Sequence, residues 1–373
     1  MGEDHIVIGS GFGDEGKGKV VSYLCSKFKN PLVIRFSGGQ QAAHHVMLKN
    51  GSEHVFSNFG SGTLQNAPTY WSKYCTVDPD GILNEYEELK EIGYTPILYI
   101  DQNSPLTTPY EKIFNKIKDD ETLHGSCGVG VGQTIQREND HYSLLFRDIK
   151  FPSILKIKLE LLEKYYNLKI DIDRFLDVCE DLSENLNIRI VDNIDHAIEF
   201  SNPDVLIFEG SQGLLLDQNH GFFPHVTRSN TGTKNVIDMG YEPTVWLVTR
   251  AYQTRHGNGP MTNENIFHKI KNNIYERNGW SAFQGHFRKT ILDLDLLKYS
   301  INVDPYFKFR KHKINLVITC IDLLNEFSYT INRKKQTENN EKDFIEKIKN
   351  TLFIKNVFIS KTPYPELEEF ISN

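Results

Sequence analysis

A glycine-rich segment near the N-terminus, GFGDEGKGK at 11–19, combines small, acidic and basic residues in an order that suits phosphate binding. Glycines allow backbone N–H groups to point at phosphate oxygens, and a following helix adds positive potential at its N-terminus. Gly11 to Lys17 fits the GxxxxGK spacing of a P-loop, in which a Ser or Thr comes next and binds Mg²⁺. Here that residue is Gly18, which has no hydroxyl. The carboxylate of Asp14 could bind Mg²⁺ instead, because this ion prefers hard oxygen ligands.

Two other interpretations of this segment are weaker. A dinucleotide-binding fingerprint has no reason to carry the sequence Asp-Glu-Gly-Lys. A strand–helix turn without a ligand has no need of four glycines, two acids and two lysines in so short a segment. We therefore expect a phosphate-binding loop.

Several further segments combine glycines with side chains that could contact a nucleotide. They are FSGGQQAAHHV at 36–46, HGSCGVGVGQT at 124–134, FEGSQGLLLDQNHGFFPHVTRSNT at 208–231 and TRHGNGPMTNE at 254–264. With the GDEGKGK core at 13–19, they resemble the signatures of the adenylosuccinate synthetase family, whose first motif usually reads GxQWGDEGKGK. The match spans nearly the whole chain, although the chain is short for the family.

The resemblance implies a GTP-dependent ligase that joins aspartate to C6 of IMP through a 6-phosphoryl intermediate. A 6-oxo group leaves poorly, so it is first made a phosphate ester, which the amine then displaces. By the resemblance, Asp14 is the general base that removes the N1 proton of the purine. His44 gives a hydrogen bond or a proton to the transferring phosphoryl group. The Mg²⁺ cofactor is implied at Asp14 and at the carbonyl of Ala43.

The resemblance also implies the residues that bind the two nucleotides. For GTP and its phosphates they are Gly13, Glu15, Gly16, Lys17, Gly18, Lys19, His45 and Asp322. For the purine nucleotide they are Gln41, Ser126, Cys127, Gln212 and Thr227. Arg228 stands where the family has Ser and adds a cation beside the expected phosphate site, while Arg255 matches the arginine of the family's TRVGAGP motif.

The segment expected to bind the amino acid departs most from the family pattern. The family's TTGRRRRTGWLD is replaced by FQGHFRKTILD at 283–293, in which Arg288 and Lys289 remain to pair with the carboxylates of aspartate. Another amine donor, another 6-oxopurine nucleotide such as dGMP, and a GTP-binding module without catalysis therefore stay open as alternatives. An aspartate at position 14 favours IMP, because dGMP-using branches typically have Ser there.

The resemblance further implies a homodimer, since active sites in the family borrow an arginine across the subunit interface. At the strict offset this chain has His141, with Arg137 nearby. The guanine-binding TKLD of the family is TCID here, at 319–322, which leaves open whether the phosphoryl donor is GTP or ATP.

Alternating strand and helix patterns must position these segments. Apolar runs predict strands at 6–8, 32–35, 96–100, 205–209, 245–248 and 316–319, and helical spacing predicts helices at 20–28, 83–91, 154–166 and 344–352. This order predicts an α/β fold with a mostly parallel central sheet flanked by helices, and the resemblance implies the P-loop-NTPase-like fold of the family. No linker divides the chain, so we expect a single domain over 1–373. The polar stretch at 333–343 predicts a loop or a solvated helix start.

Composition limits the class of protein further. The net charge of −7 and the pI near 6.0 argue against general nucleic-acid binding. Five dispersed cysteines without a CxxC pair argue against a disulfide framework or a zinc site and favour a reducing compartment. No apolar stretch approaches the roughly 20 residues of a membrane helix, and the N-terminus lacks a signal-peptide pattern. We expect a cytoplasmic protein that binds no membrane.

Overall fold

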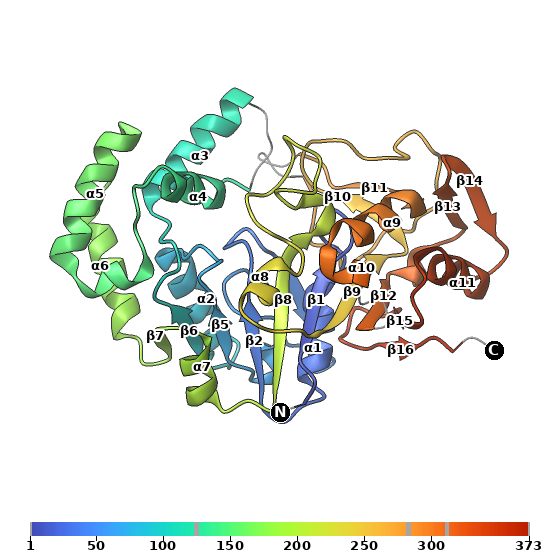
Figure 1. The fold of residues 1–373 in the computed structure, drawn as a ribbon, viewed down its shortest axis with the longest axis horizontal. Helices are drawn as coiled ribbons and strands as arrows, with labels where there is room; N and C mark the ends of the chain where they lie inside the picture. The colour runs from blue at the N-terminus through green and yellow to red at the C-terminus, as the bar shows by residue number, and fades with distance from the viewer. Residues whose placement is uncertain (1, 123–126, 281–284, 310–312, 372–373) are drawn as a thin grey trace.

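The computed structural model describes residues 2–122, 127–280, 285–309 and 313–371. Its centre is a ten-stranded sheet in which all neighbouring strands are parallel except at one edge, where β16 is antiparallel (Figure 1). From that edge the strands are β16 (Glu368–Glu369), β15 (Asn356–Ser360), β12 (Ile314–Thr319), β9 (Thr244–Arg250), β1 (His5–Gly9), β8 (Val205–Gly213), β2 (Pro31–Arg35), β5 (Thr69–Trp71), β6 (Leu98–Asp101) and β7 (Ile188–Val191). The predicted α/β class and mostly parallel sheet are confirmed, and each predicted strand overlaps an observed one.

The central strands are apolar along their whole length because helices and loops cover both faces of the sheet. Every residue of β2 and of β9 is buried, and β1 is buried from its second residue onward. A strand that is covered on both faces carries a continuous apolar run instead of an alternating one. That run was the signal that predicted these strands.

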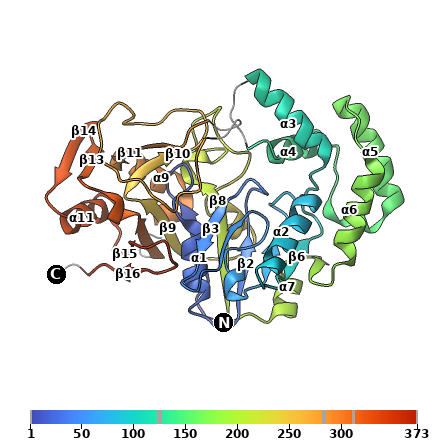
Figure 2. The same cartoon turned by 180° about the vertical axis from the view of Figure 1, so that it is seen from behind.

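Helices cover both faces of the central sheet, and further helices lie beyond its two edges (Figures 1 and 2). The larger ones are α1 (Lys17–Cys25), α2 (Pro79–Glu91), α3 (Pro109–Thr122), α4 (Val131–Asn139), α5 (Pro152–Tyr166), α6 (Ile172–Glu184), α7 (Ile194–Ser201), α9 (Leu294–Val303) and α11 (Glu341–Leu352), with short α8 (Lys234–Asp238) and α10 (Pro305–Phe309). The predicted helices are confirmed, although the first begins three residues earlier than predicted and ends at Cys25. In both views α5 and α6 form one end of the molecule, and α11 lies near the other.

A smaller sheet lies beside the central one, with strand order β10 (Tyr252–Arg255), β11 (Arg288–Asp293), β13 (Phe327–Ile331) and β14 (Lys334–Glu338). The prediction of a loop or helix start at 333–343 is wrong for β14. This strand pairs antiparallel with β13 and is almost fully exposed. A charged, exposed edge strand carries no apolar pattern to reveal it, and lysines are common on such edges. A further hairpin consists of β3 (His44–Met47) and β4 (Glu53–Phe56).

The strand order places the sequence motifs together. β1 lies between β8 and β9, and β2 lies on the other side of β8. The glycine loop follows β1, the segment at 36–46 follows β2, and FEGSQG forms the end of β8. Loops at the carboxyl ends of adjacent parallel strands form the ligand-binding side of an open α/β sheet.

Among the described residues, no helix is long and apolar enough to cross a membrane.

Candidate active site

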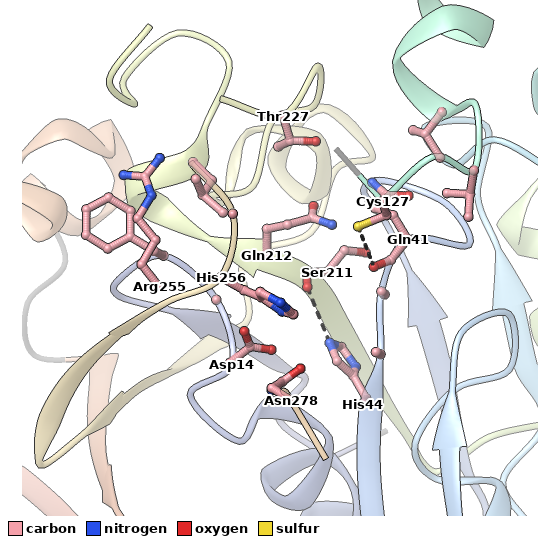
Figure 3. Close-up of a pocket in the computed structure, with 18 of the residues that line it drawn as sticks. Asp14, Gln41, His44, Cys127, Ser211, Gln212, Thr227, Arg255, His256 and Asn278 are labelled. Carbon is pink, nitrogen blue, oxygen red and sulfur yellow. Dashed lines mark hydrogen bonds between the residues drawn. The ribbon is translucent and has the colours of Figure 1, made fainter. Parts of the chain in front are cut away.

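A cavity of about 1080 Å³ opens at the carboxyl ends of β1, β2 and β8 (Figure 3). Most of the residues predicted to bind nucleotides or metal line it. These are Gly13, Asp14, Gly16, Lys17, Gly18, Lys19, Gln41, Ala43, His44, His45, Cys127, Gln212 and Thr227. The structure thus brings together residues from four motifs that are far apart in the sequence.

The loop between β1 and α1 is held in shape by Glu15, whose side chain turns away from the cavity. Its carboxylate accepts hydrogen bonds from the backbone N–H groups of Gly11 (2.9 Å) and Gly13 (3.0 Å) and from Nζ of Lys17 (3.0 Å). Gly13 and Gly16 have φ values of 93° and 98°, a region that disfavours residues with a side chain. Glu15 was predicted to bind phosphate. In the structure its carboxylate instead accepts hydrogen bonds from the loop itself and so stabilises the loop conformation.

Gly18, the departure from the P-loop pattern, has a steric cause. A Cβ atom at this position would lie 2.8 Å from Cβ of His44 and 2.8 Å from Oγ of Ser61. Helix α1 therefore packs so closely on β3 that a serine or threonine could not replace this glycine without a shift. The close approach places the α1 N-terminus and the His44 ring at one wall of the cavity.

Asp14 lies half-buried in the cavity wall with a left-handed backbone (φ 60°). Arg250 fixes this backbone, because its Nε donates to the Asp14 carbonyl at 2.6 Å while its Nη1 donates to Glu276 at 2.7 Å. Burial raises the pKa of the Asp14 carboxyl, and the nearby charges of Arg250 and Lys17 oppose that rise. A carboxylate with a raised pKa is a stronger base than an exposed aspartate.

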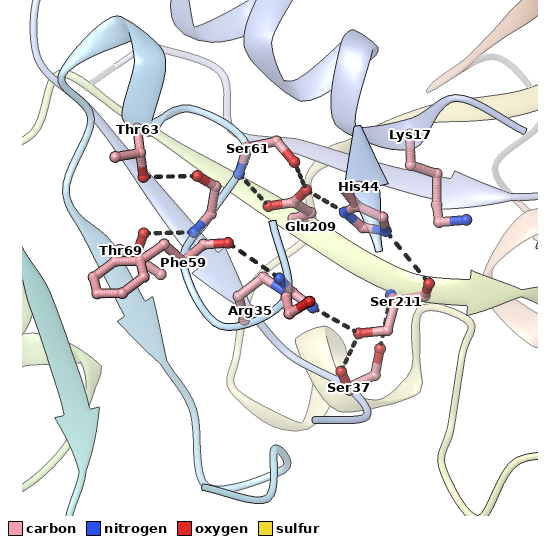
Figure 4. Close-up of polar contacts among 12 residues, drawn as sticks. Lys17, Arg35, Ser37, His44, Phe59, Ser61, Thr63, Thr69, Glu209 and Ser211 are labelled. Atoms are coloured by element: carbon pink, nitrogen blue, oxygen red, sulfur yellow. Dashed lines mark hydrogen bonds and ion pairs between the residues drawn. The ribbon is translucent and has the colours of Figure 1, made fainter. Parts of the chain in front are cut away.

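His44 forms a buried pair with Glu209 at the end of β8 (Figure 4). The Nδ1 atom lies 2.5 Å from Oε1 of Glu209, and Nε2 lies 3.4 Å from the carbonyl oxygen of Ser211. Burial lowers the pKa of His44, and the Glu209 carboxylate opposes that effect. A carboxylate at Nδ1 fixes the ring and its tautomer, so Nε2 is the nitrogen available for acid–base work.

Glu209 is kept ionised by its surroundings although it is fully buried. Burial by itself would raise its pKa, but His44, Arg35 and the hydroxyl of Ser61 outweigh burial and lower the pKa to about 2. The backbone N–H of Ser61 donates to Oε2 at 2.9 Å, and its hydroxyl donates to Oε1. Arg35 is itself held by Oγ of Ser211 (3.2 Å). A network of buried polar groups therefore positions the imidazole (Figure 4).

Several polar atoms that line the cavity have no partner among the described residues. They are both ends of the Gln41 side-chain amide, Oε1 of Gln212 and Nε2 of His256. Figure 3 shows Gln212 between Asp14 and Thr227, with Cys127 and Gln41 beside it. Because buried polar groups are normally hydrogen-bonded, this set indicates a binding site for a polar ligand.

His45 also lines the cavity, and its Nε2 pairs with Glu53 across the β3–β4 hairpin at 3.1 Å. Asp322 is exposed in the 3₁₀ turn after β12, outside the residues that line the cavity, although it lies near enough to Lys19 to affect that lysine. Burial lowers the pKa of Lys19, and the Asp322 charge opposes this. Ser126 lies outside the described residues.

The two residues predicted to hold the amino acid are not among those that line the cavity. Arg288 donates to Glu264 (2.7 Å) and to the carbonyls of Gly257 (2.7 Å) and Gly259 (3.0 Å). It therefore braces the turn that carries His256 to the cavity. Lys289 follows it on β11.

Arg137 is fully buried, and its guanidinium donates to Glu111 (2.6 Å) and to the carbonyl of Leu106 (2.7 Å). These contacts make it a structural residue of α4. His141 is exposed just after α4 with φ 66°.

The site includes several residues that the sequence analysis did not identify, and of these only Glu209 lies within one of the motifs. Glu209, Arg35 and Arg250 each carry a charge at or near the carboxyl end of an otherwise apolar strand, and this was the available signal. Nothing in the sequence around Ser61 indicated that this residue contributes to the site. Within the described residues there is no cluster of three or more His, Cys, Asp or Glu side chains that could hold a metal on its own.

Comparisons with known proteins agree with this geometry. The family model for adenylosuccinate synthetase matches residues 6–358. The adenylosuccinate synthetase of Edwardsiella ictaluri is 30% identical over 85% of this chain and 78% of its own, and that of Pelodictyon phaeoclathratiforme is 27% identical over 88% and 80%.

Two solved structures share the fold. A fully ligated adenylosuccinate synthetase from Plasmodium falciparum superimposes with a TM-score of 0.80 at 20% identity, covering 98% of each chain. The succinoaminodeoxyadenylate synthetase of cyanophage S-2L, bound to dGMP and dATP, has a TM-score of 0.66 at 14% identity, covering 98% of this chain and 95% of its own. With a family model that covers nearly the whole chain and relatives that align along most of it, the protein belongs to the adenylosuccinate synthetase family and is a ligase.

Proposed function

We propose that the protein transfers the γ-phosphoryl group of GTP to O6 of IMP and then joins aspartate at C6, forming adenylosuccinate, GDP and phosphate. One observation carries this proposal. The half-buried Asp14 carboxylate and the His44 ring, which Glu209 holds from behind, face the same cavity, beside the glycine loop and the α1 N-terminus. Family membership supports the reaction class.

Asp14 acts first, as the base that accepts the N1 proton of the purine. Removal of this proton makes O6 a better nucleophile toward the γ-phosphorus. The raised pKa of Asp14 strengthens the base, and the hydrogen bond from Arg250 to its carbonyl keeps it in place. The proton passes from Asp14 to solvent after the amine has displaced phosphate, because N1 of the 6-aminopurine product carries no proton.

His44 acts on the transferring group. Its Nδ1–H donates to Glu209, and the Glu209 carboxylate stabilises the imidazolium form of the ring. In that protonated form Nε2–H can donate to a phosphoryl oxygen as charge develops there. The backbone N–H groups at the start of α1 and the amines of Lys17 and Lys19 stabilise the same charge.

Mg²⁺ fits these residues as an ion shared between protein and nucleotide. The Asp14 carboxylate and the Ala43 carbonyl line the same cavity and offer hard oxygens, and Mg²⁺ commonly binds through one or two protein oxygens plus substrate phosphates. When bound, it would neutralise charge on the β- and γ-phosphates. Further ligands would come from nucleotide and water.

A related reaction with another amine or another 6-oxopurine nucleotide is the second candidate. One observation favours it: Arg288, the predicted partner of aspartate, makes its hydrogen bonds to Glu264 and to the turn at 257–259 instead of lining the cavity. The phage enzyme of similar fold is bound to dGMP, which makes this nucleotide the natural alternative to test. A GTP-binding module without catalysis is disfavoured by the intact Asp14 and His44–Glu209 arrangement.

The test is to incubate the protein with Mg-GTP or Mg-ATP, IMP or dGMP, and a panel of amino acids, and to identify products by mass. We expect adenylosuccinate only when GTP, IMP and aspartate are all present. An Asp14→Asn variant is the matched negative control. If product forms with dGMP but not with IMP, or with an amine other than aspartate, the second candidate replaces the proposal.

A homodimer and a cytoplasmic location also stay predictions. Light scattering of the purified protein at several concentrations measures the first. Only the distribution of the protein in its own cell measures the second.

A further inference from the structure

We propose that Arg228 is the cation that binds the 5′-phosphate of the purine nucleotide, and that Gln136 holds it in position. The inference rests on the proposed function, because it concerns the substrate of the same cavity. It identifies a substrate-binding side chain at a position where the family has serine.

The position of Asp14 determines the direction in which a nucleotide must lie in the cavity. A purine whose N1 proton goes to Asp14 has its base at that side of the cavity. Thr227 and Cys127 lie away from Asp14, beyond Gln212 (Figure 3). The ribose and its phosphate would therefore extend toward Thr227 and the segment that precedes α4.

That end of the cavity already favours an anion. The segment 127–133 lines this end of the cavity. Gly130, with φ 83°, is the N-cap residue directly before α4. The first N–H groups of a helix have no partner within the helix, and here they are available at the cavity wall. A Cβ at Gly130 would lie 3.0 Å from the backbone of Glu111, so the tight approach of this turn requires glycine.

Arg228 places a positive charge over this turn. It lines the cavity, and its Cδ atom lies 3.8 Å from where a Cβ on Gly132 would be. Its Nη1 donates to Oε1 of Gln136, one turn further along α4. The side chain is otherwise exposed, so its remaining N–H groups can reach a ligand in the cavity.

A chain of hydrogen bonds fixes Gln136 in turn. Its Nε2 donates to Oδ1 of Asp140 at 2.9 Å, and the hydroxyl of Tyr165 donates to Oδ2 of Asp140 at 2.6 Å. These two bonds lower the pKa of Asp140, so its carboxylate is ionised. The amide oxygen of Gln136 therefore points at Arg228, and the guanidinium is positioned before a ligand arrives.

The other arginines that line the cavity are Arg250, Arg255 and Arg277, and each already has partners in the protein, although Nε of Arg255 has none among the described residues. Arg255 lies 4.2 Å over the ring of Phe12 and donates to the carbonyls of Pro260 and His225. Arg277 pairs with Glu53 on the β3–β4 hairpin. Lys118 on α3 also lines the cavity near 127–133 and is the competing candidate for the phosphate.

Calorimetric binding of a nucleotide and of its nucleoside separates phosphate contacts from all others and needs no turnover. The pairs are IMP with inosine and dGMP with deoxyguanosine, measured on wild type, Arg228→Gln, Gln136→Leu and Lys118→Gln. We expect Arg228→Gln to weaken nucleotide binding about 10- to 100-fold and nucleoside binding less than about twofold, as for loss of a charge-assisted hydrogen bond. Gln136→Leu should weaken nucleotide binding by a smaller factor, and Lys118→Gln by less than about threefold.

Each contrary result has a distinct meaning. Equal nucleotide affinity in Arg228→Gln and wild type would overturn the inference and leave the proposed function intact. So would an equal loss for nucleotide and nucleoside, or a loss confined to Lys118→Gln. Failure of wild type to bind either nucleotide would overturn the proposed function and this inference together. Raised salt should weaken nucleotide binding more in wild type than in Arg228→Gln, because ionic contacts are screened.

Discussion

Glu209→Gln perturbs the proposed acid–base site by removing one charge and almost no volume. Glu209 is fully buried and accepts from the His44 ring and from both the N–H and the hydroxyl of Ser61. A glutamine oxygen can keep part of this set, but its NH₂ group cannot accept from a second donor. His44 or Ser61 is then left without an acceptor, and the fixed tautomer of the imidazole is lost.

The effect on catalysis follows from the role of His44. Without an anion at Nδ1, the imidazole no longer presents a well-oriented Nε2–H to the transferring phosphoryl group. General acid–base catalysis contributes typically 10²–10⁴-fold, so we expect kcat to fall by about this factor. Binding of GTP and of IMP should change little, because Glu209 is not among the residues that line the cavity.

The effect on stability follows from the pKa of Glu209. It lies at about 2, below the ordinary 4.5, so the ionised form is stabilised in the folded protein. At about 1.4 kcal/mol per pKa unit, the gap between 4.5 and about 2 corresponds to about 3 kcal/mol at neutral pH. A lowered folded-state pKa gives stability that is present above the unfolded pKa and lost as pH falls toward the folded one. The difference between wild type and Glu209→Gln should therefore be about 3 kcal/mol at pH 7 and shrink between about pH 4.5 and 2.

Steady-state kinetics and urea unfolding at pH 7, 4 and 3 measure both effects. Glu85→Gln is the matched control, because Glu85 is also buried and accepts several N–H bonds at 57–59, but, unlike Glu209, it does not hold the His44 ring. It should lose stability and keep its kcat. Should Glu209→Gln retain kcat within about threefold, or differ in stability from wild type by the same amount at every pH, the charged His44–Glu209 pair would be refuted.

Three further predictions concern the same cavity. Asp14→Asn should lower kcat by about 10²–10⁴-fold and remove the acidic limb of the pH–rate profile, because the amide cannot accept the N1 proton. An unchanged limb would exclude Asp14 as the base. Gly18→Ser should destabilise the protein by about 1–3 kcal/mol in thermal or urea unfolding and reduce kcat, because the new Cβ would lie 2.8 Å from His44 and Ser61. If the variant unfolded with wild-type stability, the close packing of α1 on β3 would be contradicted. Arg288→Ala should raise the KM for the amino acid more than the KM for GTP; equal increases would mean that it only braces the turn at 257–259.

Sequence reasoning succeeded where one local signal was enough. Continuous apolar runs predicted the buried parallel strands, and the glycine loop with its acids and lysines predicted the phosphate-binding end of the sheet. It failed for β14, whose charged residues pair with β13 at an exposed edge. Pairing across strands is a tertiary property, and an edge strand of this kind has no apolar period to indicate it.

The sequence by itself determined the family, the fold class and the segments that meet at the cavity, because residue types and spacing within each motif carry that information. Only the tertiary structure decided what each side chain does there. Glu15 accepts hydrogen bonds from the backbone of its own loop, and Glu209 pairs with His44. Arg288 donates to the turn at 257–259. The direction of a charged side chain depends on which donors and acceptors the fold places within about 3 Å of it. Those groups often come from distant segments: His44 and Glu209 are 165 residues apart in the sequence.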